Sequence, residues 1–292
     1  MKILVIGKNG QLAKSIKKIS QQKNYSHLNN FVFAGKEEID LTNLNSIKNY
    51  FNNSNVDIVI NCAAYTAVDK AEDDEILANL VNHIAVKELA NIAKKKNISL
   101  VHISTDYVFD GLKGKPYNED DRAFPLNSYG KSKLSGENAL LSVKNLNAII
   151  VRTGWVYSEF GRNFVKTVLS HANNNKSINM ISDQFGTPTY ANDLANAILT
   201  IAISEKFLSK NKLSKIYNFS NLGGCTWFDF AREIINLYDT QCIVNPIQTK
   251  EFPLPAKRPS YSILNKKLVI KDFDLTIKHW KESLKACMKN LK

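Results

Sequence analysis

The chain has 292 residues, of which 44% are hydrophobic and 23% are charged, and its formal net charge is +12. This length suits one large α/β domain, or such a domain with a smaller lobe, and the composition argues against disorder. Its longest apolar runs, residues 2–7 and 57–64, are too short to span a membrane, and the first runs straight into a glycine loop, unlike a signal peptide. We therefore expect a cytoplasmic protein that has no membrane partner.

The positive charge is spread along the whole chain rather than gathered in one arm or stripe. The short cluster Lys94–Lys96 comes where a helix is expected to end, and cations are favourable there. No recognised nucleic-acid-binding module is present, so we expect no nucleic-acid partner. An anionic small ligand fits the excess charge better.

The four cysteines are scattered and form no Cys-x-x-Cys pair. They are Cys62, Cys225, Cys242 and Cys287. We interpret them as free thiols and expect no metal, with disulfides or a metal site as the alternatives.

Short β-type runs alternate with helical patterns in the first half of the chain. Strands are expected at residues 2–6, 31–34, 56–62, 99–104 and 147–153, and helices from near residues 11, 43, 70 and 127. This alternation predicts a parallel sheet with helices on both faces. The strands are continuous Ile/Val runs, as expected when both faces are covered. The predicted fold class is therefore α/β with a doubly wound parallel sheet.

A glycine loop joins the first strand to its helix. It reads Gly7-Lys8-Asn9-Gly10-Gln11-Leu12-Ala13. Glycines at this junction let the backbone approach a pyrophosphate, which then lies at the helix N-terminus. An ordinary turn would look similar, but the position at the first strand–helix junction favours a dinucleotide-binding, Rossmann-type site.

The end of the second strand discriminates between the two nicotinamide dinucleotides. An acidic residue there binds the ribose hydroxyl of NAD, and a basic residue accommodates the 2′-phosphate of NADP. Here the strand is followed by Gly35 and Lys36, and the first acid is Glu37. We therefore expect NADPH as cofactor, with Lys36 as the phosphate partner and NADH as a possible substitute.

A proton-transfer group is expected at the carboxyl end of the fourth strand. Thr105 and Asp106 follow that strand directly, where open α/β sheets bind their ligands. Tyr129 and Lys133 follow in a helical segment and share one helix face. A neighbouring ammonium favours a phenolate, so Lys133 is expected to lower the pKa of Tyr129 and to hold the nicotinamide ribose. A Tyr-x-x-x-Lys pair can also be a plain surface pair, but the glycine loop and the strand-end hydroxyl of Thr105 favour catalysis.

Two polar residues near this group are harder to assign. Asn82 lies in the helix after the third strand and could brace the active-site backbone or cap a local kink. His102 is interpreted as a satisfied strand residue rather than a base.

The pattern changes after about residue 155. A helix is expected near 161–173, followed by a short run at 178–182, a turn-rich segment at 183–190, a helix at 191–203, a strand at 216–220 and a Pro-rich stretch at 252–259. We assign residues 1–154 and about 190–220 to the NAD(P)-binding domain. Residues about 155–189 and 221–292 are assigned to a smaller substrate-binding lobe.

Several longer stretches together resemble the dTDP-4-dehydrorhamnose reductases, a family of extended short-chain dehydrogenase/reductases. The stretches occur in the family's order over nearly the whole chain: residues 7–12, 61–72, 104–111, 125–137, 152–157, 162–167, 183–189 and 258–265. The resemblance implies reduction of the C4 keto group of dTDP-4-dehydro-6-deoxy-L-mannose by NADPH, with Tyr129 as proton donor, to give dTDP-L-rhamnose. This product is a precursor of cell-surface polysaccharide such as lipopolysaccharide O-antigen.

The resemblance also implies roles for single residues. The pyrophosphate would lie against Gly10, Gln11 and Leu12 next to Gly7, the adenine near Asp40 and Leu41, and the dinucleotide over Ala63, Ala64 and Tyr65. Thr105 and Asp106 would contact the sugar and Trp155 would pack against it. Lys70 and Arg258 are candidates for the nucleotide diphosphate, with a surface salt bridge as the alternative for each.

Some relatives form a magnesium-linked dimer, and two of the corresponding positions here are Ser15 and Asn192. These side chains are poor Mg²⁺ ligands, so no metal is carried over. The sequence leaves the oligomeric state open between a monomer and a homodimer.

Two other functions also remain as alternatives. One is a related 4-keto reductase or epimerase that gives another deoxyhexose product. The other is a catalytically silent regulatory subunit that binds NADP.

Overall fold

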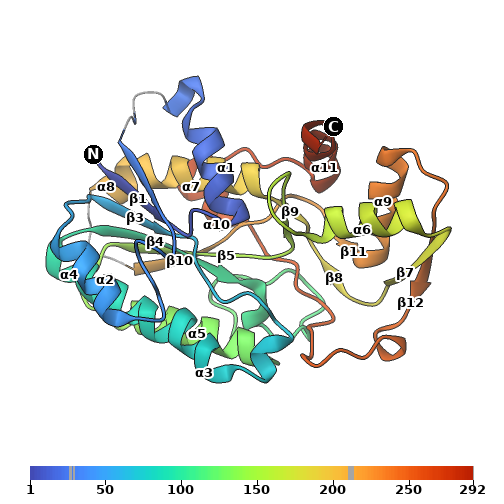
Figure 1. The fold of residues 1–292 in the computed structure, drawn as a ribbon, viewed down its shortest axis with the longest axis horizontal. Coiled ribbons are helices and arrows are strands. Elements are labelled where there is room, and N and C mark those ends of the chain that lie inside the picture. The colour runs from blue at the N-terminus through green and yellow to red at the C-terminus, as the bar shows by residue number, and fades with distance from the viewer. Residues whose placement is uncertain (26–27, 29, 210–213, 292) are drawn as a thin grey trace.

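The main sheet of the computed structural model has six parallel strands in the order β10-β5-β4-β3-β1-β2 (Figure 1). The model describes residues 1–25, 28, 30–209 and 214–291. In chain order these strands are β1 (Ile3–Ile6), β2 (Phe31–Ala34), β3 (Ile58–Asn61), β4 (Ser99–Thr105), β5 (Ala148–Thr153) and β10 (Ser214–Asn218). The strand order reverses at β1, which pairs with β2 on one side and β3 on the other. Such a switch point leaves a crevice at the carboxyl ends of the strands. The predicted doubly wound α/β fold is confirmed.

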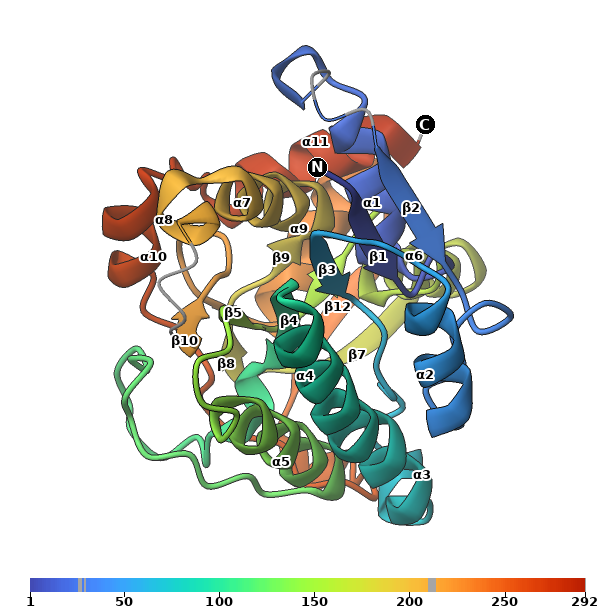
Figure 2. The same cartoon turned by 90° about the vertical axis from the view of Figure 1, so that its left-hand side faces the viewer.

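Helices cover both faces of this sheet (Figure 2). One face carries α1 (Gln11–Ser20) and α7 (Ala191–Ile203), and the other carries α2 (Leu44–Asn52), α4 (Ala85–Lys96) and α5 (Ser128–Leu141). Alternate residues of β1 serve the two faces, since Ile3 and Val5 belong to one buried cluster and Leu4 and Ile6 to the other. This explains why the strand reads as an unbroken apolar run.

The expected helix from residue 70 is divided into several pieces. A 3₁₀ turn (Lys70–Glu72) is followed by α3 (Glu75–Asn79), a π-helical turn (Leu80–Ile84) and then α4. Helix α4 ends at Asn97 in the left-handed region, with φ 56°, and its last turn holds Lys94–Lys96. The lysine cluster therefore lies at a helix C-terminus, where cations stabilise the dipole.

The second part of the molecule is built from short strand pairs around an aromatic core. The parallel pairs are β6 (Val156–Tyr157) with β9 (Thr189–Tyr190) and β7 (Ser177–Ile181) with β12 (Ile243–Ile247), and the antiparallel pair is β8 (Phe185–Gly186) with β11 (Cys225–Thr226). The helices are α6 (Phe164–Asn174), α9 (Trp227–Tyr238) and α11 (Trp280–Leu291). Tyr157, Phe230 and Trp280 are central to its buried cluster.

The remaining elements are short. They are α8 (Glu205–Leu208), α10 (Lys267–Phe273) and the 3₁₀ turns Lys23–Tyr25, Asp106–Val108 and Thr249–Glu251. One segment of the expected lobe lies elsewhere, because Val269, Phe273, Leu275 and Ile277 pack into the cluster beneath α1 and α7. Residues 267–277 therefore pack with the sheet half, although the sequence predicts them in the lobe. The proposed division of the chain stays a prediction.

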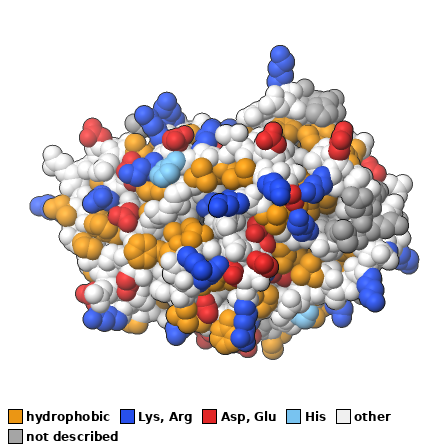
Figure 3. Space-filling view, turned by 180° about the vertical axis from the view of Figure 1, so that it is seen from behind, with side chains coloured by type: hydrophobic (Ala, Val, Ile, Leu, Met, Phe, Trp, Pro, Cys, Tyr) orange, Lys and Arg blue, Asp and Glu red, His pale blue; other side chains and the backbone are white. Residues whose placement is uncertain are grey.

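The surface and the cysteines agree with an ordinary globular protein. On the face drawn in Figure 3, Lys and Arg side chains are scattered among acidic and apolar ones. Cys225, Cys242 and Cys287 are buried free thiols and Cys62 is a half-buried one. Within the described ranges, no helix has the length and apolar character needed to cross a membrane.

Candidate active site

A cavity of about 780 Å³ lies along the carboxyl ends of β1, β3 and β4. It brings together most of the residues expected from the sequence. Those lining it are Gly7, Gly10, Gln11, Leu12, Lys36, Asp40, Leu41, Ala63, Ala64, Thr105, Asp106, Tyr129, Lys133 and Trp155. Tyr65, Lys70 and Arg258 do not line it.

The glycine loop is shaped for close backbone approach. Gly7 has φ +97°, and a Cβ there would lie 3.0 Å from the backbone nitrogen of Ala63. Glycine therefore lets the loop after β1 touch the segment after β3. The side chain of Gln11 accepts hydrogen bonds from Ser158 Oγ (2.9 Å) and Asn163 Nδ2 (3.0 Å). Gln11 thus ties the loop to the lobe and leaves the start of α1 for an anion.

Lys36 lies at the rim of the cavity, next to the glycine loop. Its side chain is 74% exposed, and its Nζ is 3.8 Å from Asp40. The two glutamates after it are engaged by Lys8, whose Nζ is 2.6 Å from Glu38 and 3.4 Å from Glu37. Lys36 is therefore a cation at the cavity whose ion pair with Asp40 is long and weak.

Tyr129 and Lys133 lie one turn apart on α5, which Asn127 caps by accepting a hydrogen bond from the backbone of Gly130 (2.7 Å). Burial raises the pKa of Tyr129 to about 12, although the neighbouring Thr105 hydroxyl opposes the shift. The expectation that Lys133 lowers this pKa is wrong for this structure, because Lys133 Nζ donates instead to the carbonyl of Ile103 (2.6 Å). The phenol is consequently protonated at neutral pH, which is the form that a proton donor requires.

Asp106 is a buried carboxyl group beside this tyrosine. Burial raises its pKa to about 6, and hydrogen bonds from Ser262 and Thr105 oppose the shift. The Thr105 hydroxyl lies 3.2 Å from the Asp106 carboxylate. Asp106 therefore faces the cavity as a group that titrates near neutral pH.

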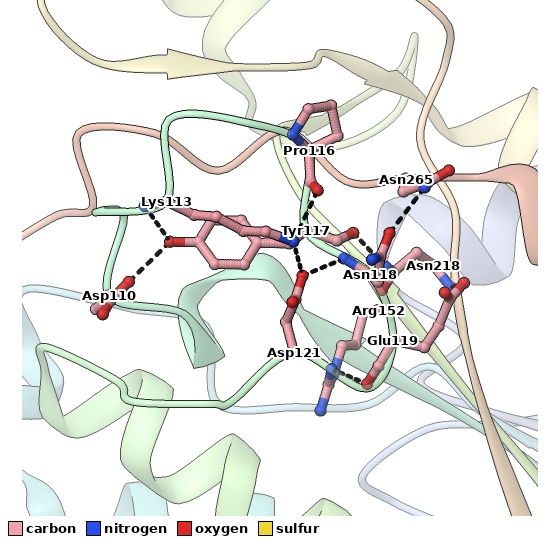
Figure 4. Close-up of polar contacts among 10 residues, drawn as sticks. All are labelled: Asp110, Lys113, Pro116, Tyr117, Asn118, Glu119, Asp121, Arg152, Asn218 and Asn265. Carbon is pink, nitrogen blue, oxygen red and sulfur yellow. Dashed lines mark hydrogen bonds and ion pairs between the residues drawn. The ribbon is translucent and has the colours of Figure 1, made fainter.

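The loop between Asp106 and α5 is held by a polar network (Figure 4). Tyr117 Oη donates to Asp110 (2.7 Å), and Lys113 forms an ion pair with Asp121. From β5, Arg152 donates to the carbonyl of Glu119 (3.1 Å), while the backbone carbonyl of Tyr117 accepts from Asn218 of β10 (2.9 Å). These bonds fix the loop that leads from Asp106 to Tyr129.

Asn82 lies in the π-helical turn and braces the cavity wall. Its Oδ1 accepts from the backbone of Tyr65 (2.9 Å), and its Nδ2 donates to the Tyr65 carbonyl (3.0 Å) and to Ser132 Oγ (3.0 Å). A Cβ at Gly136 would lie 2.1 Å from the carbonyl oxygen of Asn82, so α5 meets this turn at a glycine. Of the two roles considered for Asn82, the brace is the one observed.

Trp155 lines the first cavity and stacks on Trp227, which connects it to a second one. Its backbone has φ 50°, and its ring stacks on Trp227 with centroids 3.4 Å apart. Trp227 lines both cavities. The second cavity, of about 500 Å³, lies in the lobe and is lined by Phe164, Gln184, Trp227, Phe252 and Arg258 among others.

The two cations expected at a diphosphate are placed differently from each other. Arg258 borders the second cavity but pairs with Asp69 through two bonds of 2.9 and 2.6 Å. Lys70 is exposed and lines neither of these cavities. Arg258 thus forms a salt bridge at the edge of this cavity, and the diphosphate role of both Arg258 and Lys70 stays a prediction.

The lining residues that the sequence reasoning missed include Trp227, Phe252 and Arg162. Trp227 begins α9 directly after a capping box formed by Thr226 and Asp229, which the sequence shows. Arg162 lines the first cavity and lies in a stretch that carried the family resemblance. Nothing local marks Phe252.

The positions linked to magnesium in relatives do not fit a metal here. Ser15 is fully buried, and Asn192 Nδ2 donates to Tyr190 Oη (2.6 Å) and Glu159 (3.2 Å). Lys18 Nζ lies 2.6 Å from the same Glu159 carboxylate, so a cation already neutralises it. Among the described residues no group of three or more His, Cys, Asp or Glu side chains could hold a metal ion.

Both a family model and individual known proteins are similar to this chain over nearly its whole length. The family model described as the RmlD substrate binding domain matches residues 1–292. A dTDP-4-dehydrorhamnose reductase of Sinorhizobium fredii is 39% identical over 287 residues, covering 97% of this chain and 95% of the relative.

Two solved structures extend the comparison. A dTDP-4-dehydrorhamnose reductase from Clostridium acetobutylicum has a TM-score of 0.91 and 39% identity, covering 100% of this chain and 99% of its own. One from Bacillus anthracis, in complex with NADP, has a TM-score of 0.90 and 34% identity, covering 99% and 100%.

Proposed function

The chain belongs to the RmlD family of dTDP-4-dehydrorhamnose reductases, and we propose that its two cavities hold the two ligands of one reduction. The enzyme is an NAD(P)H-dependent oxidoreductase that reduces the C4 keto group of dTDP-4-dehydrorhamnose to form dTDP-L-rhamnose. The roles of individual residues in this reaction are our proposal.

The larger cavity is assigned to the dinucleotide. Its pyrophosphate is placed at Gly10, Gln11 and Leu12, where a helix N-terminus and an open glycine turn favour an anion. Arg162 borders the same cavity and supplies a positive charge. Lys36 binds the 2′-phosphate of NADPH, because it faces the cavity with only a 3.8 Å ion pair.

The other members of the cofactor site follow the lining of the cavity. Asp40 and Leu41 lie near the adenine, and Ala63 and Ala64 lie beneath the dinucleotide. The backbone of Tyr65, held by Asn82, supports this wall. Gly7 permits the close contact between the loop and Ala63.

The second cavity is assigned to the nucleotide of the substrate. Aromatic rings of Phe252 and Trp227 suit a base, and Gln184 offers polar atoms for its edge. Arg258 borders this cavity and is placed near the diphosphate, where Lys70 would add a second charge. The sugar then extends past Trp155 to Thr105 and Asp106.

Tyr129 is the proton donor of the reaction. Bound NADPH supplies the hydride for C4 of the sugar. Thr105 and Tyr129 line the same cavity close to each other, so both hydroxyls can reach one substrate oxygen. Tyr129 gives its proton to that oxygen as negative charge develops on it. Lys133 assists from one turn away by holding the nicotinamide ribose. The single observation that carries this mechanism is a half-buried, protonated Tyr129 beside Thr105 in the cavity.

The cellular location, oligomeric state and partners of the enzyme are also part of the proposal. We place it in the cytoplasm, as a monomer or homodimer that acts on a small nucleotide sugar. No nucleic-acid or membrane partner is assigned.

The test is an assay of NADPH oxidation with enzymatically generated dTDP-4-keto sugar, followed by NMR of the product. We expect stoichiometric oxidation and a rhamnose product. A talose product would overturn the assigned stereochemistry in favour of a related 4-keto reductase. A well-folded chain that binds NADPH but does not oxidise it would support the regulatory alternative.

A further inference from the structure

Lys133 is fully buried, yet the protein offers its amine few hydrogen-bond acceptors. An ammonium group carries three donors and no acceptor. The carbonyl of Ile103 accepts one of them at 2.6 Å. The carboxylate of Glu137, one turn further along α5, is taken by three bonds from Arg152 of 2.6 to 3.2 Å.

His102 is the other polar group at this amine, and its Nε2 lies 3.3 Å from Lys133 Nζ. The ring is buried in β4, and its Nδ1 is 3.2 Å from Asn61 Nδ2. Burial, the larger cause, lowers the pKa of His102 well below its ordinary value, and any positive charge on Lys133 would lower it further. The imidazole is therefore neutral, with one nitrogen that donates and one that accepts.

Asn61 decides which nitrogen donates. Its Oδ1 accepts a hydrogen bond from the backbone N–H of Ala63 (3.1 Å), and because that N–H can only donate, the amide oxygen must face it. The Asn61 amide therefore points its NH₂ group at His102 Nδ1, so Nδ1 must accept. The ring proton is consequently on Nε2, directed at Lys133.

We propose that Asn61 and His102 form a buried positioning pair that presents an N–H to Lys133, so that Lys133 takes up a proton when the cofactor binds. Facing a donor, the amine is favoured in its neutral form, which accepts from His102. Ribose hydroxyls of a bound dinucleotide would supply the acceptors that an ammonium lacks here. This inference rests on the proposed cofactor site and adds a proton-linked binding step to it.

The other titratable and charged groups around Lys133 do not supply those acceptors. They are His102 on β4, Tyr129 and Glu137 on α5, Arg152 on β5 behind Glu137, and Asp106 beyond Tyr129. Burial lowers the pKa of Lys133 to about 8, with Glu137 opposing the shift. The amine can therefore change its charge within an accessible pH range.

Calorimetry of NADPH binding to the full chain tests the proposal without catalysis. Titrations in two buffers with different ionisation enthalpies, repeated from pH 6.5 to 9.5, measure the protons taken up. We expect uptake of about half a proton, largest near pH 8 to 9, because the ligand favours the charged amine. Uptake that peaks near pH 6 would point to the 2′-phosphate and overturn the proposal.

The Asn61→Asp variant should move the ring proton of His102 from Nε2 to Nδ1. A carboxylate accepts from both Ala63 and His102 Nδ1, which moves the ring proton to Nδ1 and leaves Nε2 to accept from an ammonium. Lys133 is then already charged, and we expect uptake near pH 8 to fall at least threefold, with the pH of maximal uptake about one unit higher. Asn55→Asp adds the same charge at an exposed site and should behave as the wild type. Equal uptake in Asn61→Asp and wild type would contradict the proposal.

The His102 tautomer can be read directly in the wild-type chain if Asn61→Asp does not fold. Nitrogen-15 NMR of the imidazoles should show one histidine that does not titrate between pH 5.5 and 9, with its proton on Nε2. A proton on Nδ1 would overturn the proposal. Failure of NADPH to bind at all would instead contradict the cofactor site.

Discussion

The sheet half and the lobe position their ligand-facing residues by different means. In the sheet half, six parallel strands bury an apolar cluster on each face, and the cavity residues come from strand ends and the turns that follow. In the lobe, several strands have only two residues, and aromatic packing around Phe230 and Trp280 holds the structure. The first arrangement places backbone groups accurately along an elongated dinucleotide. The second gathers side chains that are far apart in the chain, as when β7 pairs with β12.

The largest effect is expected where the two halves meet, at Tyr129. Tyr129→Phe removes the proton donor and keeps the ring, so kcat should fall about 10³-fold, within the range for general acid catalysis. The dissociation constant of NADPH, measured by fluorescence titration, should change little. Stopped-flow measurement of NADPH oxidation gives the rate.

A matched variant controls for the loss of a phenol. Tyr238 lies on the lobe with an exposed side chain, and Tyr238→Phe should keep full activity. If Tyr129→Phe retains similar turnover to the wild type, the proton comes from elsewhere and the proposed mechanism is wrong.

Asp106 connects the halves, because its carboxylate accepts from Thr105 of the sheet and Ser262 of the lobe. Its folded pKa of about 6 lies above the ordinary value, so the folded state holds a proton that the unfolded chain releases between about pH 4 and 6. Stability is therefore lost as the pH rises through this window. Asp106→Asn should raise the free energy of unfolding by about 2–3 kcal/mol at pH 8 and by little below pH 4.

Urea unfolding at the two pH values measures this difference. Asp120→Asn changes the same group at an exposed position and should show no such pH dependence. A gain at pH 4 equal to that at pH 8 would mean that packing, rather than the charge of Asp106, is responsible. The gain in stability should come with weaker sugar binding, since Asp106 faces the substrate.

Much of the sheet half could be predicted from the sequence because its signals are local. Continuous apolar runs marked β1 to β5, and the glycine loop marked the switch point. The direction of the pKa shift at Tyr129 could not be predicted, because it depends on burial and on Lys133 turning to Ile103. The role of Asn82 likewise required the contact with Tyr65, 17 residues away.

The lobe was less predictable because its contacts are long-range. Phe252 reaches the second cavity from a Pro-rich stretch that has no periodicity, and Trp227 stacks on Trp155 across the fold. Residues 267–277 return to the sheet half, where Val269 and Phe273 are buried. No local sequence motif indicates any of these long-range contacts.

Substitution of a lobe residue that lines the second cavity should weaken binding of the sugar nucleotide and should not change binding of the dinucleotide. Phe252 is 54% exposed and borders the second cavity, so Phe252→Ala should not disturb the core. Loss of stacking on the base should raise KM for the dTDP-sugar about tenfold, with kcat within twofold.

Phe124→Ala is the matched control, since Phe124 is 56% exposed and lines neither of the cavities described above. Steady-state kinetics with NADPH in excess separates the two parameters. A tenfold change in the dissociation constant of NADPH would show that the two halves do not bind their ligands independently.

The smallest effect is expected at Lys36, on the rim of the sheet half. Its side chain is 74% exposed, so an ion pair with phosphate gains only modest energy in water. Lys36→Ala should raise the dissociation constant of NADPH about fivefold and leave that of NADH unchanged, because only NADPH carries the 2′-phosphate.

Lys48→Ala removes an exposed cation outside the cavity and should change neither constant. The NADPH effect should shrink with added salt, as screening weakens an exposed pair. Equal weakening of NADH and NADPH would place Lys36 at a group the two share, and the preference for NADPH would then have to come from another residue.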